Sequence, residues 1–503
     1  MKRLGKNIFF SVIYKLILVL TGLIVQKYVL SNFGSDINGL YSSITQFLAY
    51  LVLLESGIGT ASIQALYKPL ANNDWVATNA IMAATKQQYG KVCRWFVILL
   101  IGLSFLMPCI VSGQVEAWTA GLLTFISGLS SVITYAFLGK YVILLTADNR
   151  IGVTYTIDSI LTIFSCALRL LAIYMNQNII VVQSILVVTS AMKSVFIFVY
   201  VKKHYKELNF KVKPNNRAIL QRWSVMVHQI AGLIVNHTDI AILTVVSTLK
   251  NVSIYSVYNY IYSNISTIVN TTFSQSIQAA FGRAAIGKQE IYNKIFKLFE
   301  SIYYGILFSI LSTALIMTLP FVSLYTESVT DTNYMLPSVA LLFCICQMMN
   351  LMRIPAIITI NAYGWFKETK KGAVIEAIIN IVISLALFPL LGLQGLLIGT
   401  VCSYLFRTQD VIFFVYRKCK IGWLNLFIDI ILNIGGFIIL TLIFFFWKPI
   451  TVNGWGQWII ITVGIFILSI VVFLLINYIP RRREYNSLAR KVYLKYIEKT
   501  SEF

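Results

Sequence analysis

Acidic residues are scarce in this chain, and so are charged residues of any kind. Only 12% of the 503 residues are charged, with 19 Asp and Glu against 41 Lys and Arg, whereas 58% are hydrophobic. A soluble core of this length does not need so much apolar side chain. The basic residues lie in short clusters between apolar runs and not on one polar domain, so we expect no nucleic acid as a partner. This distribution predicts a polytopic membrane protein.

Several familiar motifs are also missing. The seven cysteines show no Cys-x-x-Cys spacing, so we expect neither a metal site nor a disulfide framework. No G-x-x-x-x-G-K-[ST] motif is present, so we expect no ATP bound to this chain as a driving force. No cofactor is predicted. The apolar run at the N-terminus is too long for a signal peptide and no small-x-small cleavage site follows it, so it is predicted to remain as the first helix.

Fourteen apolar runs reach the length of about 20 residues that a bilayer core requires. They span roughly residues 6–30, 38–62, 92–112, 117–139, 152–175, 179–201, 223–247, 252–281, 299–325, 335–361, 372–390, 393–416, 424–447 and 456–479. If the N-terminus is cytoplasmic, inner segments hold 33 of the 41 Lys and Arg, outer loops hold three, and five lie inside spans. Because cytoplasmic loops retain basic residues, both termini are predicted to face the cytoplasm.

The second span and its flanks recur later in the chain. A shift of 214 positions sets Tyr41-Ser42 on Tyr255-Ser256 and Ile63-Gln64-Ala65 on Ile277-Gln278-Ala279, which indicates two parallel repeats. The polar segments 64–89 and 281–296 are interpreted as short helices on the cytoplasmic face. The predicted organisation is an N-terminal six-helix lobe (1–201), a cytoplasmic basic linker (202–222), a C-terminal six-helix lobe (223–416), helices 13 and 14 (417–479) and a basic cytoplasmic tail (480–503).

One stretch near the N-terminus resembles a known family. Its segments are Phe33-Gly34, Asn38-Gly39-Leu40-Tyr41, Gln46-Phe47-Leu48, Leu53-Leu54-Glu55-Ser56-Gly57-Ile58-Gly59 and Ala65-Leu66-Tyr67-Lys68-Pro69-Leu70-Ala71. They resemble the first repeat of Wzx-type polysaccharide and oligosaccharide flippases of the multidrug/oligosaccharidyl-lipid/polysaccharide (MOP) exporter superfamily. The residue-level likeness covers about the first 100 residues; beyond them the likeness is in span count, internal doubling and basic inner loops.

This resemblance implies an all-α fold with about 14 transmembrane helices, in two six-helix lobes around a central cavity plus two C-terminal helices, as in MATE/MOP proteins. It also implies a flippase, not an enzyme, working by alternating access in the bacterial cytoplasmic membrane. The implied substrate is an undecaprenyl-diphosphate-linked oligosaccharide, moved from the inner to the outer leaflet for cell-surface polysaccharide synthesis. Membrane lipids, glycosyltransferases and a glycan polymerase are the implied partners.

A diphosphate crossing the membrane needs a cationic cavity, since an unpaired charge in hydrocarbon costs several kcal/mol. Lys15 and Arg353 lie far from the nearest loops, and together with Arg169 they are the predicted binding residues. The alternative is that each base pairs with an intramembrane acid and locks helices together. The other two bases inside spans are Lys193, which is near enough to the inner face to snorkel, and Arg407, which has Asp410 at i+3.

The predicted carriers of a coupling proton or sodium ion are Glu55, Asp239 and Glu376, because neutralising an intramembrane carboxylate removes most of its desolvation penalty. Glu55 has an alternative role in a structural salt bridge, for example with Lys15. The histidines of span 7, His228 and His237, are interpreted mainly as packing residues.

Three tyrosines share one face near the outer end of span 8, because Tyr255, Tyr258 and Tyr262 follow i, i+3, i+7 spacing. An aromatic belt at the membrane interface is the commoner explanation, and a sugar-stacking wall at the cavity mouth is the alternative.

Two other functions are alternatives to the flippase. A membrane-embedded polysaccharide polymerase would need an outer loop with catalytic acids or arginines, and the outer loops here are short and nearly uncharged. A multidrug/cation antiporter of the same superfamily usually has twelve spans and an acidic cavity. Fourteen spans and several intramembrane bases favour an anionic substrate.

Overall fold

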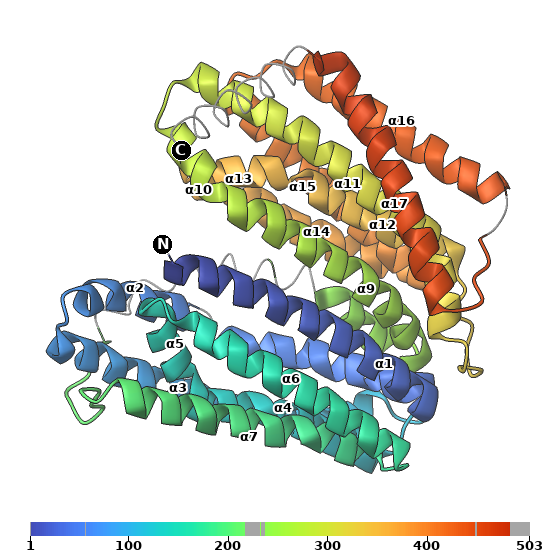
Figure 1. The fold of residues 1–503 in the computed structure, drawn as a ribbon. Coiled ribbons are helices and arrows are strands. Elements are labelled where there is room, and N and C mark those ends of the chain that lie inside the picture. Colours follow the sequence, from blue (N-terminus) through green and yellow to red (C-terminus); the bar gives the residue numbers. More distant parts are fainter. Residues whose placement is uncertain (1, 56, 217–231, 233–236, 448–449, 483–503) are drawn as a thin grey trace. The chain divides into compact units, whose positions relative to one another are not determined.

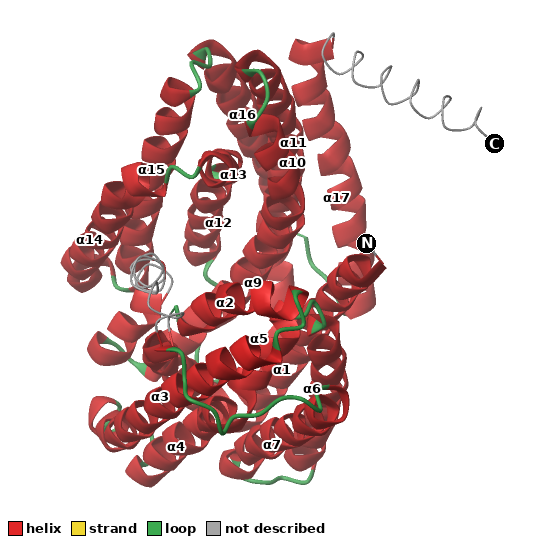
Figure 2. Ribbon diagram, turned by 90° about the vertical axis from the view of Figure 1, so that its left-hand side faces the viewer, coloured by secondary structure: helices red, strands yellow, loops and turns green. Residues whose placement is uncertain are grey.

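The computed structural model describes residues 2–55, 57–216, 232, 237–447 and 450–482, and these residues form helices joined by short loops (Figures 1 and 2). No strand occurs among them. Ten helices in this described part are long and apolar enough to cross a membrane. The predicted all-α, multi-pass membrane fold is therefore confirmed.

The chain forms two compact units. Unit 1 comprises residues 1–256 and 328–332, and unit 2 comprises residues 257–327 and 333–503. The helices that belong to unit 1 are α1 (Lys2–Leu51), α2 (Ile58–Ala71), α3 (Trp75–Ile110), α4 (Ala117–Ile133), α5 (Gly139–Ala147), α6 (Ile151–Tyr174) and α7 (Ile179–His204). A 3-10 turn, Val52–Glu55, separates α1 from α2, and a π-helical turn, Thr134–Leu138, separates α4 from α5.

Unit 2 continues from α9 (Leu249–Val269), which begins in unit 1. A π-helical turn, Asn270–Gln275, follows α9, and a 3-10 turn, Ile479–Arg481, follows the last helix. The helices between these turns are α10 (Ser276–Ala285), α11 (Gln289–Tyr325), α12 (Pro337–Met352), α13 (Ile354–Tyr363), α14 (Phe366–Leu391), α15 (Leu393–Lys418), α16 (Trp423–Trp447) and α17 (Trp455–Tyr478).

Helix limits confirm the internal repeat. Helix α15 begins and ends 214 positions after α7, and α11 begins 214 positions after α3. The shift found in a few matching residues thus relates whole helices of the two units. Helices 13 and 14 of the sequence prediction correspond to α16 and α17, which both pack on α11.

A kink at Gly34 joins two predicted spans into one helix. Gly34 has φ +80° and ψ 177°, a conformation that residues with a Cβ atom rarely adopt, so the expected outer turn is a sharp bend inside α1. Beyond the bend, the N–H and Oγ of Ser35 donate hydrogen bonds of 2.7 and 2.6 Å to the carboxylate of Asp331. Through these bonds the segment 328–332 is attached to α1 within unit 1.

The boundary between the compact units does not fall in the predicted basic linker. It lies between Ser256 and Val257, inside α9. The reason is a set of buried hydrogen bonds that join α1 to the residues after the linker: Asn38 Nδ2 donates to Ser253 Oγ at 2.7 Å, and the hydroxyls of Ser43 and Thr244 lie 2.6 Å apart. Most of predicted span 7, including His228, lies outside the described residues.

The polar segments 64–89 and 281–296, expected as short helices, lie partly in the short helices α2 and α10 and partly in the first turns of the long helices α3 and α11. Helix α3 starts at Trp75 and runs for 36 residues, and α11 starts at Gln289 and runs for 37, so both extend well before the predicted spans. Asp74 fixes the start of α3, because its side chain accepts a hydrogen bond from the N–H of Ala77 at 2.9 Å. An N-cap signal at Asp74 was therefore present in the sequence and was overlooked.

Candidate functional site

Unit 1 contains a polar cavity between α1, α6 and α7, with a volume of about 330 Å³. Its wall combines hydroxyl-bearing side chains with three charged ones and a few apolar ones. The hydroxyl groups belong to Tyr14, Thr21, Tyr41, Thr162, Ser165, Thr189 and Ser190, and the charges belong to Asp158, Arg169 and Lys193. Such a wall is unusual inside a helical membrane protein, where ionisable groups mark functional positions.

Two of the three charges form an ion pair across the cavity wall. Lys193 Nζ on α7 lies 2.7 Å from Asp158 Oδ1 on α6. The sequence favoured a Lys193 side chain that snorkels to the inner face, and this interpretation is wrong because the ammonium group has an acid within reach on the neighbouring helix. The pair neutralises both charges.

Arg169 has no such counter-charge. It is 8% exposed, and its Nη2 donates to Gln183 Oε1 at 3.3 Å, while Gln183 Nε2 donates to Ser127 Oγ at 3.2 Å. Within the described part of the chain no carboxylate pairs with Arg169, and neither its Nε nor the Oγ of Ser165, one turn earlier, has a hydrogen-bond partner. A guanidinium stays protonated in proteins, so the cavity wall carries one uncompensated positive charge.

Lys15 is half-buried on α1 beside the cavity residue Tyr14. It does not line the cavity, and it makes no ion pair with any residue that the structure describes, so the alternative salt bridge with Glu55 is not formed. Its predicted contact with substrate stays a prediction.

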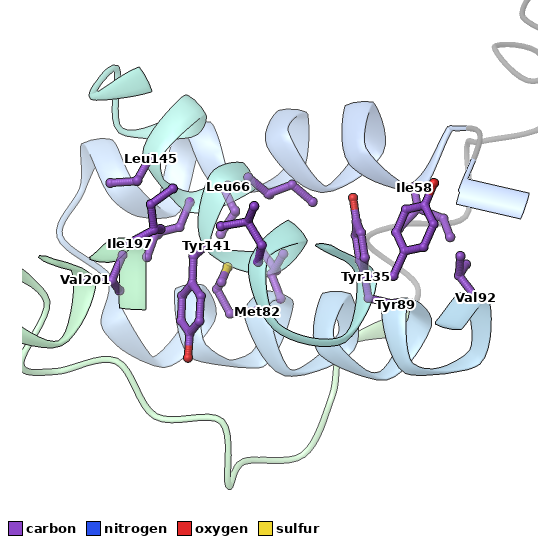
Figure 3. Close-up of a cluster of buried hydrophobic side chains, with 14 of the residues drawn as sticks. Ile58, Leu66, Met82, Tyr89, Val92, Tyr135, Tyr141, Leu145, Ile197 and Val201 are labelled. Atoms are coloured by element: carbon purple, nitrogen blue, oxygen red, sulfur yellow. The ribbon is translucent and has the colours of Figure 1, made fainter. Parts of the chain in front are cut away.

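Glu55 lies at the break between α1 and α2. The hydroxyl of Tyr89 donates a hydrogen bond to Glu55 Oε1. The ring centroid of Tyr135 lies 6.2 Å from that of Tyr89. Both tyrosines belong to the buried cluster shown in Figure 3. Gly57, two residues after the acid, has φ +81°, which lets the chain turn before α2 begins. No basic side chain among the described residues pairs with Glu55.

Asp239 lies on a further short helix of unit 1, His237–Val246, which is hydrogen-bonded to α1 through Thr244 and Ser43. It is 4% exposed and accepts a hydrogen bond of 2.9 Å from the hydroxyl of Tyr255. The neighbouring His237 contacts Gln46 through Nδ1 and lies edge-on to the ring of Tyr50. Asp239 is thus held inside unit 1, and its predicted role in ion coupling stays a prediction.

Unit 2 contains a network of two bases and two acids. Glu376 on α14 lies 2.6 Å from Arg353 Nη1 and 3.5 Å from Arg407 Nε, and Arg407 Nη1 lies 2.5 Å from Asp410. Asn350 accepts a further bond from Arg353 at 2.7 Å. Arg353 and Glu376, which the sequence placed in separate roles, are partners, and the pairing of Arg407 with Asp410 is present as expected.

The repeat relates the ion pairs of the two units. Arg407 follows Lys193 by 214 positions, and each base reaches an acid on the preceding long helix. Sequence reasoning missed this relation because the shift was traced through the second span alone.

The three tyrosines of span 8 lie inside the fold. Tyr258 and Tyr262 are 0% exposed and both stack on Phe343, with ring centroids 6.1 and 6.0 Å apart, so the predicted common face is confirmed for this pair. Tyr258 donates to the carbonyl of Tyr334 at 2.6 Å. Because these rings and that of Tyr255 are enclosed, they form neither a membrane belt nor an open wall in this conformation, and a role in sugar stacking stays a prediction.

Two buried acids of unit 2 were overlooked in the sequence. Glu300 is 1% exposed and accepts hydrogen bonds from the hydroxyls of Tyr304 and Tyr416, and Asp429 on α16 lies 2.5 Å from Arg481. An acid inside an apolar run was a usable signal for Asp429. Both groups join helices within unit 2, so we interpret them as structural.

These features define the class of the protein, a multi-pass, all-α membrane protein built from two related helical units. No protein-family model matches the chain, and no curated protein matches it either. Solved structures do match, beginning with the lipid II flippase MurJ in an inward closed conformation, at a TM-score of 0.71 and 14% identity, covering 94% of this chain and 99% of that one.

Transporters of the MOP superfamily match as well. A MATE family multidrug resistance transporter in an inward-facing conformation has a TM-score of 0.60 and 11% identity, covering 80% of this chain and 94% of its own. A MOP superfamily transporter from Pyrococcus furiosus has a TM-score of 0.54 and 13% identity, covering 83% and 96%. The chain therefore has a MATE/MurJ-like fold.

Proposed function

We propose that this protein is a Wzx-type flippase that moves an undecaprenyl-diphosphate-linked oligosaccharide from the inner to the outer leaflet of the bacterial cytoplasmic membrane. Both termini face the cytoplasm, glycosyltransferases supply the substrate, and a polymerase uses it for cell-surface polysaccharide. The likeness to a lipid II flippase over nearly the whole length of both chains supports this proposal.

One observation carries the choice of an anionic substrate. Arg169 brings a buried positive charge to a polar cavity, and the acid in the same cavity, Asp158, is already neutralised by Lys193. A cavity for a drug cation would need the opposite balance, with an acid in excess. A cation antiporter of the same fold is therefore the second candidate and not the first.

The diphosphate group is assigned to Lys15 and Arg353. Lys15 has no ion-pair partner within the described residues, so it is available to an anion without any exchange. Arg353 is bound to Glu376 at 2.6 Å, and phosphate would have to displace this carboxylate. A guanidinium offers phosphate a bidentate fork, which makes such an exchange chemically reasonable.

Ion coupling is assigned first to Glu55. Asp239 and Glu376 are the other two candidates, but Glu376 already serves two arginines. Glu55 accepts a hydrogen bond from a neutral tyrosine hydroxyl, so a proton or a sodium ion can bind its carboxylate without separating an ion pair.

The test uses the purified protein in liposomes that contain fluorescent undecaprenyl-diphosphate-linked oligosaccharide. Movement between leaflets is measured as accessibility of the glycan to a membrane-impermeant oxidant, and uptake of a fluorescent organic cation is measured in parallel. We expect protein-dependent movement of the lipid and none of the cation. Movement of the cation without movement of the lipid would refute the flippase function and support the cation antiporter.

A further inference from the structure

We propose that the cavity of unit 1 binds one sugar residue that carries an acidic group, either a carboxylate or a phosphoryl group, with Arg169 as the counter-ion of that group. This inference names a part of the substrate and rests on the proposed function only for the source of the sugar. It concerns a site distinct from Lys15, which does not line the cavity, and from the charge network of unit 2.

Charge is the first step of the argument. Asp158 and Lys193 neutralise each other at 2.7 Å, so the net charge of the cavity is that of Arg169. The Arg169 side chain is more than nine-tenths buried and has only the neutral Gln183 as a partner in the described chain. A buried guanidinium that cannot lose its proton is stabilised by an anion, and this cavity is where the anion would lie.

Directional hydrogen bonding is the second step. Among the described residues, neither Arg169 Nε nor Ser165 Oγ has a hydrogen-bond partner. The two residues lie one turn apart on α6 and both line the cavity. Nε together with an Nη group presents two parallel donors, the arrangement that binds a carboxylate or phosphoryl group in a bidentate manner.

The remaining wall fits a sugar. It presents hydroxyls from α1, α6 and α7, together with the Asp158 carboxylate as an acceptor and the ring of Tyr14. Hydroxyl groups both donate and accept hydrogen bonds, which matches the hydroxyls of a pyranose ring. The volume of about 330 Å³ is at the lower end of the range of about 300–1,000 Å³ for ligand pockets, so the site accommodates a single sugar residue and not an oligosaccharide.

Binding of free ligands to the full-length protein in detergent tests the proposal by isothermal titration calorimetry. The four probes are glucuronate, glucose 1-phosphate, glucose and inorganic phosphate. We expect at least one of the two acidic sugars to bind about tenfold or more tightly than glucose and than inorganic phosphate. If inorganic phosphate binds as tightly as the acidic sugars, the cavity binds anions in general and the proposal fails. If glucose binds as tightly as they do, the acidic group is not recognised and the proposal also fails. No binding of any probe would overturn the proposal as well.

Variants locate the site. Arg169→Gln should weaken binding of the acidic sugar by about 10- to 100-fold, because it removes charged hydrogen bonds, while Arg169→Lys keeps the charge and loses the fork. Arg94→Gln is the matched control, since Arg94 is exposed on α3 and should leave binding unchanged. Thr189→Trp keeps every charge and fills the cavity, so it should also abolish binding; unchanged binding in Arg169→Gln and Thr189→Trp would overturn the proposal.

The two proposals fail separately. If the protein binds the acidic sugar but moves no lipid, the proposed sugar site is supported and the proposed flippase function is refuted. If the protein moves the lipid but binds no sugar, the flippase function is supported and the sugar site is refuted. The titrations of the wild-type protein test the sugar site even if a variant does not fold.

Discussion

Replacing Glu376 with glutamine should destabilise unit 2 strongly. The substitution keeps the size of the side chain but removes its negative charge. The Glu376 carboxylate lies 2.6 Å from Arg353 and 3.5 Å from Arg407, so the variant leaves Asp410 as the single acid of a network with two bases. The Glu376 side chain is 8% exposed and those of the two arginines are 13% and 12% exposed, so solvent screens the charges only weakly. Leaving a buried charge uncompensated costs about 3–5 kcal/mol.

The expected loss lies near the lower limit of that range. Arg407 keeps its contact with Asp410 at 2.5 Å, whereas Arg353 keeps Asn350 as a neutral partner. At a slope of about 2–4 °C per kcal/mol for a unit of this size, about 3 kcal/mol corresponds to a fall of roughly 6–12 °C in the midpoint of thermal unfolding. The assay is tryptophan fluorescence of the purified protein in detergent during heating.

The control and the rescue make this reasoning specific. Glu368→Gln changes an exposed acid on the same helix and should leave the midpoint unchanged. Adding Arg353→Gln to Glu376→Gln removes one uncompensated base and should restore part of the lost stability, which a double-mutant cycle measures as a coupling energy. If Glu376→Gln is as stable as the wild type but loses ion-dependent transport, the structural reasoning is refuted and the coupling role is supported.

Three further predictions concern other parts of the chain. Glu55→Gln should remove the dependence of lipid movement on a proton or sodium gradient while the unfolding midpoint stays unchanged; retained dependence in the liposome assay would assign the coupling elsewhere. Gly372→Ala should lower stability by about 1–3 kcal/mol in the same heating assay, because a Cβ atom there would lie 2.0 Å from a carboxylate oxygen of Asp410. Reporter fusions after Asn251 and after Lys420 should give opposite topology signals, and matching signals would contradict the predicted orientation.

The sequence was most informative about helices and least informative about pairs of side chains. Apolar runs and the shift of 214 positions located most helices and their repetition, because both depend on periodic and local properties of the chain. The merging of two spans at Gly34 was missed, since an outer turn and a kinked helix share the same glycine signal. Asp158 and Lys193 were both visible as intramembrane charges. Their pairing depends on how α6 and α7 are rotated and packed, which no local pattern contains.

The two units differ in how their buried charged groups are balanced, and this difference can be tested by substitution. Glu376 in unit 2 lies 214 positions after Thr162, a neutral residue of the unit 1 cavity, and Ile383 lies 214 positions after Arg169. Unit 2 therefore has an extra acid where unit 1 has a hydroxyl, and unit 1 has an extra base where unit 2 has an apolar residue.

Thr162→Glu should convert the charge balance of unit 1 into that of unit 2. By analogy with Glu376 and Arg407, the new carboxylate would lie near Lys193, and the cavity would lose its net positive charge. We expect binding of the acidic sugar to fall about tenfold or more although Arg169 is untouched, because like charges then face each other in a confined space. Thr162→Gln has nearly the size of Thr162→Glu without its charge, so it measures the effect of size and of the lost hydroxyl alone, and its loss of binding should be clearly smaller than that of Thr162→Glu. If both variants bind equally well, the net charge of the cavity does not determine what enters it.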